Sequence, residues 1–158
     1  FLCNVRMGTR AEGNSLAIKS GPLEVPYVPR RGYADGPYGQ VHFRDTGSNG
    51  KEDATVVLLA QAPHSSRQFE NVYEKLKDAN IRAIGIDYPG FGESDPCDFV
   101  PTIEDFAEIV PPVLDHLGLD SADVLGHHTG AFVAACLSLQ HPSRVKRLVL
   151  NGYAVRID

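Results

Sequence analysis

The chain has 158 residues, which is the length of one domain with a single core. Its formal net charge is −5 with scattered basic residues, so we expect no nucleic-acid partner, no membrane partner, and small molecules or proteins instead. Cys3, Cys97 and Cys136 are odd in number and widely spaced, which favours free thiols in a cytoplasmic protein without a metal site. No residue pattern indicates a cofactor.

The N-terminal part lacks periodicity and is interrupted by Gly21-Pro22, Pro26 and Pro29. We therefore predict a disordered or loosely attached arm over residues 1–31 and a folded domain over residues 32–158. The domain begins with a predicted pair of short antiparallel strands, residues 32–35 and 40–45, around a Gly/Pro turn.

Residues 55–60 form a continuous β-branched and apolar run, which is typical of a strand covered on both faces, so we place it at the centre of the sheet. Apolar residues at helical spacing then predict a helix to about Lys77, with Ser65 or Ser66 as its N-cap. The next strand covers residues 82–87 and ends in a turn-rich loop over residues 88–95.

Thr102 begins a predicted helix that Gly118 ends, but Pro111 and Pro112 lie in its interior. Because an interior proline costs about 3 kcal/mol or more, we expect a kink or two shorter helices. A strand at residues 123–125, a helix ending near His141 and a strand at residues 146–151 complete the pattern. Alternating strands and helices predict an α/β fold, a mostly parallel sheet with helices on both faces.

The segment Gly126-His127-His128-Thr129-Gly130 joins an apolar strand to an apolar helix. Glycines at the first and fifth positions allow a sharp turn that leaves the central residue exposed, as in the G-x-S-x-G nucleophile elbow. His128 occupies that central position, where a serine is usual.

The sequence resembles the α/β-hydrolase superfamily, most closely its haloalkane dehalogenase, epoxide hydrolase and esterase-like members. The resemblance covers residues 32–158 and rests on motifs in order along the chain: the strand at residues 56–59, the loop at residues 84–95, the variant G-H-H-T-G elbow at residues 126–130, and residues 141–150. It implies the α/β-hydrolase fold and a hydrolase of small esters, epoxides, halides or related molecules.

The resemblance also implies where the site lies. The backbone N–H groups of Ala62 and Thr129 occupy the family's oxyanion-hole positions. His128 can attack the substrate, act as a general base toward water, or simply fill the turn. His127 is given no chemistry, and Asp87 is interpreted as structural.

In complete members of the superfamily the catalytic acid and histidine follow later strands, and a cap domain precedes them. The chain ends at Asp158, so we expect it to be a fragment with its C-terminal part missing. The alternative to a hydrolase is a non-catalytic binding protein or inactive fragment that keeps the scaffold without a nucleophile.

Overall fold

Two buried strands, β3 (Ala54–Leu59) and β4 (Ile81–Ile86), form the centre of a six-stranded sheet with the order β1-β2-β4-β3-β5-β6. The computed structural model describes residues 27–153. Strands β4, β3, β5 (Ala122–His127) and β6 (Val145–Asn151) run parallel, each pairing with its neighbour in this order. The prediction of a mostly parallel sheet with the strand after residue 54 at its centre is therefore confirmed.

The sheet begins with a hairpin of β1 (Arg30–Gly36) and β2 (Gly39–Asp45), and β2 pairs antiparallel with β4. The hairpin turns between Gly36 and Gly39, as the Gly/Pro pattern predicts. Strand β1 starts at Arg30, two residues before the predicted domain boundary. Most of the predicted arm falls outside the described residues, so its extent stays a prediction.

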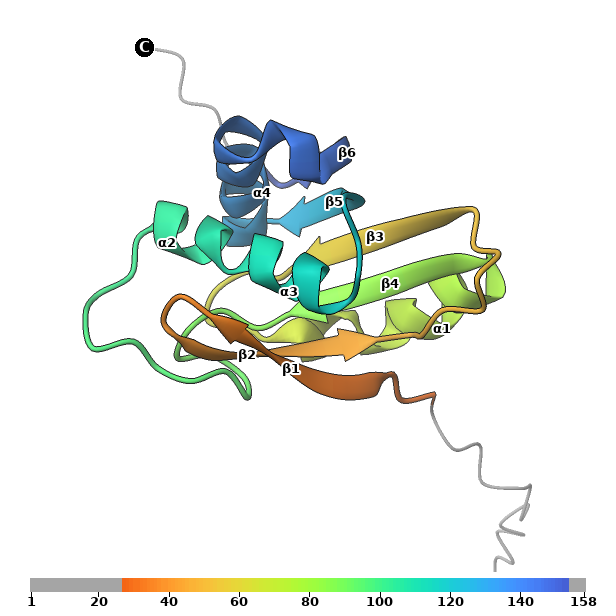
Figure 1. Ribbon diagram of the computed structural model, residues 1–158, viewed down its shortest axis with the longest axis horizontal. Coiled ribbons are helices and arrows are strands. Elements are labelled where there is room, and N and C mark those ends of the chain that lie inside the picture. Colours follow the sequence, from red (N-terminus) through yellow and green to blue (C-terminus); the bar gives the residue numbers. More distant parts are fainter. Residues whose placement is uncertain (1–26, 154–158) are drawn as a thin grey trace, which may run out of the picture.

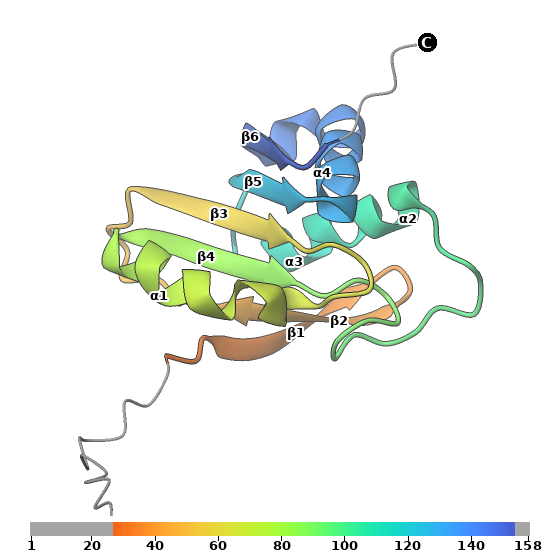
Figure 2. The same ribbon diagram turned by 180° about the vertical axis from the view of Figure 1, so that it is seen from behind.

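Helices cover both faces of the sheet (Figures 1 and 2). The short helix η1 (Ser66–Phe69) and helix α1 (Glu70–Asp78) lie on one face, whereas α2 (Ile103–Glu108), α3 (Val110–His116) and α4 (Thr129–Gln140) lie on the other.

The side chains of β3 alternate between the two layers, because successive residues of a strand face opposite sides. Val57 and Leu59 join the core under α2, α3 and α4, whereas Leu58 and Ala60 join Tyr73 of α1 in the other. Burial on both sides thus explains why the residues from Val57 to Ala60 are consecutively apolar.

The conflict at Pro111 and Pro112 is resolved by two shorter helices, as predicted. Helix α2 ends at Glu108, and α3 begins at Val110 with proline in its first turn. Proline is tolerated there because the first N–H groups of a helix have no partner within the helix. Thr102 forms a capping box with Asp105 at the start of α2.

Strand β6 lies at one edge of the sheet, after the short helix η2 (Pro142–Arg144). Its apolar residues Leu148, Val149 and Leu150 are exposed. Among the helices of residues 27–153, none combines the length and apolar character that crossing a bilayer requires.

Candidate active site

A single residue, His128, connects the end of β5 to the start of α4. Its backbone has φ 49° and ψ −112°. Asn80 is the only other non-glycine residue of the described chain with positive φ. Because such a conformation is strained for a residue with a Cβ, the surrounding backbone must hold His128 in place.

Two hydrogen bonds supply part of that hold. The His128 N–H donates to the Asn151 carbonyl at 2.8 Å, and the Ala131 N–H donates to the His128 carbonyl at 2.9 Å. The turn is therefore anchored to the end of β6 on one side and to the first turn of α4 on the other.

Gly126 and Gly130 flank the turn where the backbone leaves no room for a side chain. A Cβ on Gly126 would lie 2.1 Å from the Gly130 carbonyl oxygen, and one on Gly130 would lie 2.0 Å from the Leu59 carbonyl oxygen. Glycine is required at these positions because the obstacles are backbone atoms, which cannot rotate aside. Helix α4 thus starts in direct contact with the end of β3.

The His128 side chain is exposed and lies beside Gly152, where an added Cβ would be 3.3 Å from its Cε1 and Nε2 atoms. Its ring is edge-on to that of His127, with centroids 4.5 Å apart at an angle of 85°. Within residues 27–153 neither ring nitrogen of His128 has a hydrogen-bond partner.

Ala62 lies in the β3–η1 loop (residues 60–65), which follows the strand end that Gly130 contacts. The Gln61 N–H donates to Gln68 Oε1 at 3.1 Å, and the His64 N–H donates to the Gln61 carbonyl at 2.7 Å. In the part of the chain that the structure describes, the N–H groups of Ala62 and Thr129 donate to no protein group. They are therefore available to an oxygen of a bound molecule.

His127 also lines a groove of about 350 Å³ on the α1 side of the sheet, while its ring stays in edge-on contact with that of His128. The groove is mostly apolar, with Gln68 and Asn151 as its other polar residues. It is lined by side chains of β3, β5, α1 and neighbouring segments: Val56, Leu58, Gln68, Phe69, Val72, Leu76, Leu125, His127 and Asn151.

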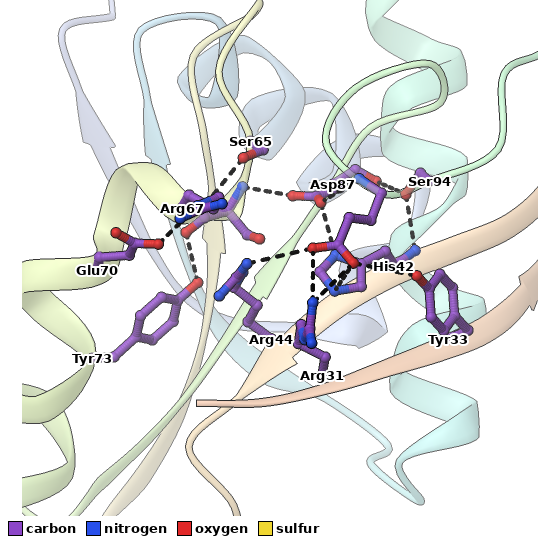
Figure 3. A network of polar contacts seen from close by, with 12 residues as sticks. Arg31, Tyr33, His42, Arg44, Ser65, Arg67, Glu70, Tyr73, Asp87 and Ser94 are labelled. Carbon is purple, nitrogen blue, oxygen red and sulfur yellow. Dashed lines mark hydrogen bonds and ion pairs between the residues drawn. The ribbon is translucent and has the colours of Figure 1, made fainter. Parts of the chain in front are cut away.

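A buried polar network lies beside the β3–η1 loop, at the carboxyl end of β4 (Figure 3). Asp87 and His42 are both buried, and Asp87 Oδ2 is 2.8 Å from His42 Nδ1. Asp87 also accepts the Ser66 N–H on Oδ1 at 2.6 Å and the Glu93 N–H on Oδ2 at 3.1 Å. Burial favours the neutral acid, but these hydrogen bonds outweigh it and hold the pKa of Asp87 below its ordinary value of 3.8.

Glu93 extends the network toward the hairpin. Its carboxylate lies 3.4 Å from Arg31 Nη1, 3.6 Å from Arg44 Nη2 and 3.9 Å from His42 Nε2. The sequence interpretation of Asp87 as structural did not include His42 or Arg44. The sequence contains a signal for this pair: His42 and Arg44 are two residues apart in β2, so their side chains lie on the same face of the strand.

The residues described here contain no group of three histidine, cysteine or acidic side chains that could hold a metal ion. At the elbow the described residues place the imidazole of His128, the neighbouring ring of His127 and the backbone N–H groups of Ala62 and Thr129.

Comparison with known proteins assigns the fold to a family. The family model of the alpha/beta hydrolase fold matches residues 54–155. A 2-hydroxy-6-oxononadienedioate/2-hydroxy-6-oxononatrienedioate hydrolase from Paraburkholderia phymatum is 36% identical over 117 residues, which are 72% of this chain and 40% of that protein. Haloalkane dehalogenase 2 from Mycobacterium bovis is 27% identical over 139 residues, 87% of this chain and 46% of that protein. An esterase from Exiguobacterium antarcticum has a TM-score of 0.66 and 26% identity, covering 73% of this chain and 42% of its own.

The sheet order, the strained turn and the sequence match together define an α/β-hydrolase scaffold. The chain belongs to the alpha/beta hydrolase fold family, and the superfamily predicted from the motifs is confirmed. It spans 40% of the length of the Paraburkholderia relative.

Proposed function

We propose that the protein is a hydrolase of small molecules, with an ester, epoxide, halide or related compound as substrate, and that His128 is its reactive residue. The observation that carries the proposal is the strained, exposed backbone of His128 between two glycines that the packing requires. Strain of this kind is maintained at functional sites more often than elsewhere. The relatives are named as an oxononadienedioate hydrolase, a haloalkane dehalogenase and an esterase, which supports a small-molecule hydrolase here.

His128 offers two routes to ester hydrolysis. In the first, a neutral ring nitrogen attacks the carbonyl carbon and the ester C–O bond breaks. The leaving alcohol takes the proton of the other ring nitrogen, and water then hydrolyses the acyl-imidazole to the acid and free histidine. In the second, the imidazole removes a proton from a water molecule as that water attacks. Both routes develop negative charge on the carbonyl oxygen.

The N–H groups of Ala62 and Thr129 are proposed to stabilise that oxygen. Thr129 follows His128 directly in the chain, so its N–H lies next to the reacting group whatever the substrate. A preorganised backbone donor of this kind contributes about 3 kcal/mol to the transition state.

The test is turnover of 4-nitrophenyl acetate by the complete natural chain and by His128→Ala. We expect His128→Ala to abolish turnover, because it removes the imidazole and keeps the backbone. His116→Ala is the matched control, since His116 is also exposed but lies on α3; it measures the background reactivity of surface histidines. Equal rates for wild type and His128→Ala would contradict a catalytic His128.

Two further measurements distinguish the two routes from each other and the hydrolase from a non-catalytic binding protein. A burst of 4-nitrophenol equal to the enzyme concentration indicates an acyl-imidazole that is hydrolysed more slowly than it forms, whereas the general-base route gives no burst. If the wild type binds small molecules without turnover, the protein is a binding member of the family. His128→Ser then reveals whether a base and an acid are present elsewhere in the complete chain, because only their presence would activate the serine.

We also propose a cytoplasmic location for the protein. The proposal is supported by the cysteines, which are odd in number and widely spaced. Cys97 and Cys136 are free thiols, as is usual in a reducing compartment.

A further inference from the structure

We infer that Tyr88 and Asp87 are positioning residues for the β3–η1 loop, which carries the Ala62 N–H. This inference rests on the proposed function, since the N–H has a catalytic role only if the protein is a hydrolase. The carrying observation is that two adjacent residues at the carboxyl end of β4 bind opposite ends of the loop.

Tyr88 holds the beginning of the loop. Its hydroxyl donates to the Ala60 carbonyl at 2.9 Å, and its side chain is fully buried. Burial raises the pKa of Tyr88, so the phenol stays protonated and remains a donor. The ring is stacked on Phe106 of α2, with centroids 4.7 Å apart, which fixes the direction of the hydroxyl.

Asp87 holds the residue at which the loop ends. Its Oδ1 accepts the Ser66 N–H, while His42 fixes the other carboxylate oxygen from the side of β2. Gly92 allows this approach, because a Cβ there would lie 2.0 Å from Asp87 Oδ2 and 2.9 Å from Ser65 Cβ. Figure 3 shows Asp87 between the Ser65 segment and His42.

The two anchors act on one short segment. Ala62 lies between the two anchors, and within the loop the Gln61 N–H is also held by Gln68. A shift at either end of so short a segment is expected to displace Ala62. A backbone donor contributes to catalysis only when it is held where the oxyanion forms, and displacement by about 1 Å costs on the order of 100-fold in rate. Tyr88 and Asp87 therefore influence the reaction without contact to the substrate.

Tyr88→Phe is the main test, because it removes one hydroxyl and keeps the stacked ring. The reporter is amide exchange at His64, whose N–H bonds to Gln61 inside the loop and touches neither anchor. We expect exchange at His64 to accelerate about fivefold, as the loss of one hydrogen bond predicts. In the complete natural chain kcat should fall about tenfold while KM stays within about twofold, because the loop is expected to bind the transition state.

The matched control is Tyr38→Phe. Tyr38 donates to Asp105 at 2.9 Å, at the start of α2, where Thr102 also binds the Asp105 carboxylate. Loss of the Tyr38 hydroxyl should therefore leave α2 and the Phe106 ring in place, and His64 exchange and kcat unaltered. Equal His64 exchange in Tyr88→Phe and Tyr38→Phe would overturn the inference.

Asp87 provides a second, independent test. Asp87→Ala removes both acceptors, whereas Asp87→Asn keeps one oxygen for the Ser66 N–H. We expect His64 exchange to rise in Asp87→Ala and to return part of the way in Asp87→Asn; identical exchange in the two folded variants and the wild type would overturn the role of Asp87. Faster exchange in a protein without any turnover would retain the loop anchors and contradict the proposed function alone.

Discussion

Replacement of Gly130 by alanine tests whether the contact between α4 and β3 fixes the turn at His128. The added Cβ would lie 2.0 Å from the Leu59 oxygen, 2.6 Å from the Leu59 carbonyl carbon and 2.8 Å from the Ala60 oxygen. Because Cβ contacts essentially never fall below 3.0 Å, the helix and the strand must separate by about 1 Å.

The cost follows from the kind of atoms involved. Overpacking in a dense interior costs about 1 to 3 kcal/mol, and rigid backbone obstacles favour the upper end of that range. Alanine gains up to about 1 kcal/mol over glycine in a helix. We therefore expect Gly130→Ala to lower the free energy of unfolding by about 2 kcal/mol.

Urea denaturation measures this difference, and amide exchange shows where it acts. Exchange should accelerate in residues 59–64, next to the two carbonyl groups that must move. Gly47→Ala is the control for the location of the effect: its Cβ would meet nothing within 4 Å, so its strain at φ +83° should leave exchange in residues 59–64 unchanged. An unfolding free energy of Gly130→Ala within about 0.5 kcal/mol of the wild type would refute the reasoning.

Further predictions concern strain, charge and capping. His128→Gly should be more stable to urea than His128→Ala by about 1 kcal/mol, since glycine relieves the positive φ; equal stability would show that the turn is unstrained. The ionised Asp87 carboxylate stabilises the folded state, because its pKa there lies below the ordinary value of 3.8. This stabilisation is complete above that value and is lost as the pH falls through the folded-state pKa. Urea midpoints from about pH 5 to pH 2 should therefore fall more steeply for the wild type than for Asp87→Asn, and parallel curves would contradict the assignment. Thr102→Ala should cost about 1 kcal/mol in urea, because it removes the side-chain cap of α2, and an unchanged midpoint would show that Asp105 alone suffices.

Local sequence determined most of the scaffold. The apolar run that became β3, the capping residue Thr102 and the proline pair after α2 each act on neighbouring residues, so their structural effect can be predicted from a short window. The glycines around His128 likewise indicate a sharp turn without knowledge of the fold.

Tertiary structure decided what those glycines contact and what holds the adjacent loop. Leu59 and Gly130 are far apart in sequence, and parallel pairing of β3 with β5 brings their segments together. His42 is likewise far from Asp87, and antiparallel pairing of β2 with β4 brings the two side chains together. A window of sequence contains no information on such pairing, because it depends on the burial of the whole sheet. The sequence by itself thus determined the hydrolase scaffold and the position of His128, whereas the anchoring of the Ala62 loop by Tyr88 and Asp87 required the folded molecule.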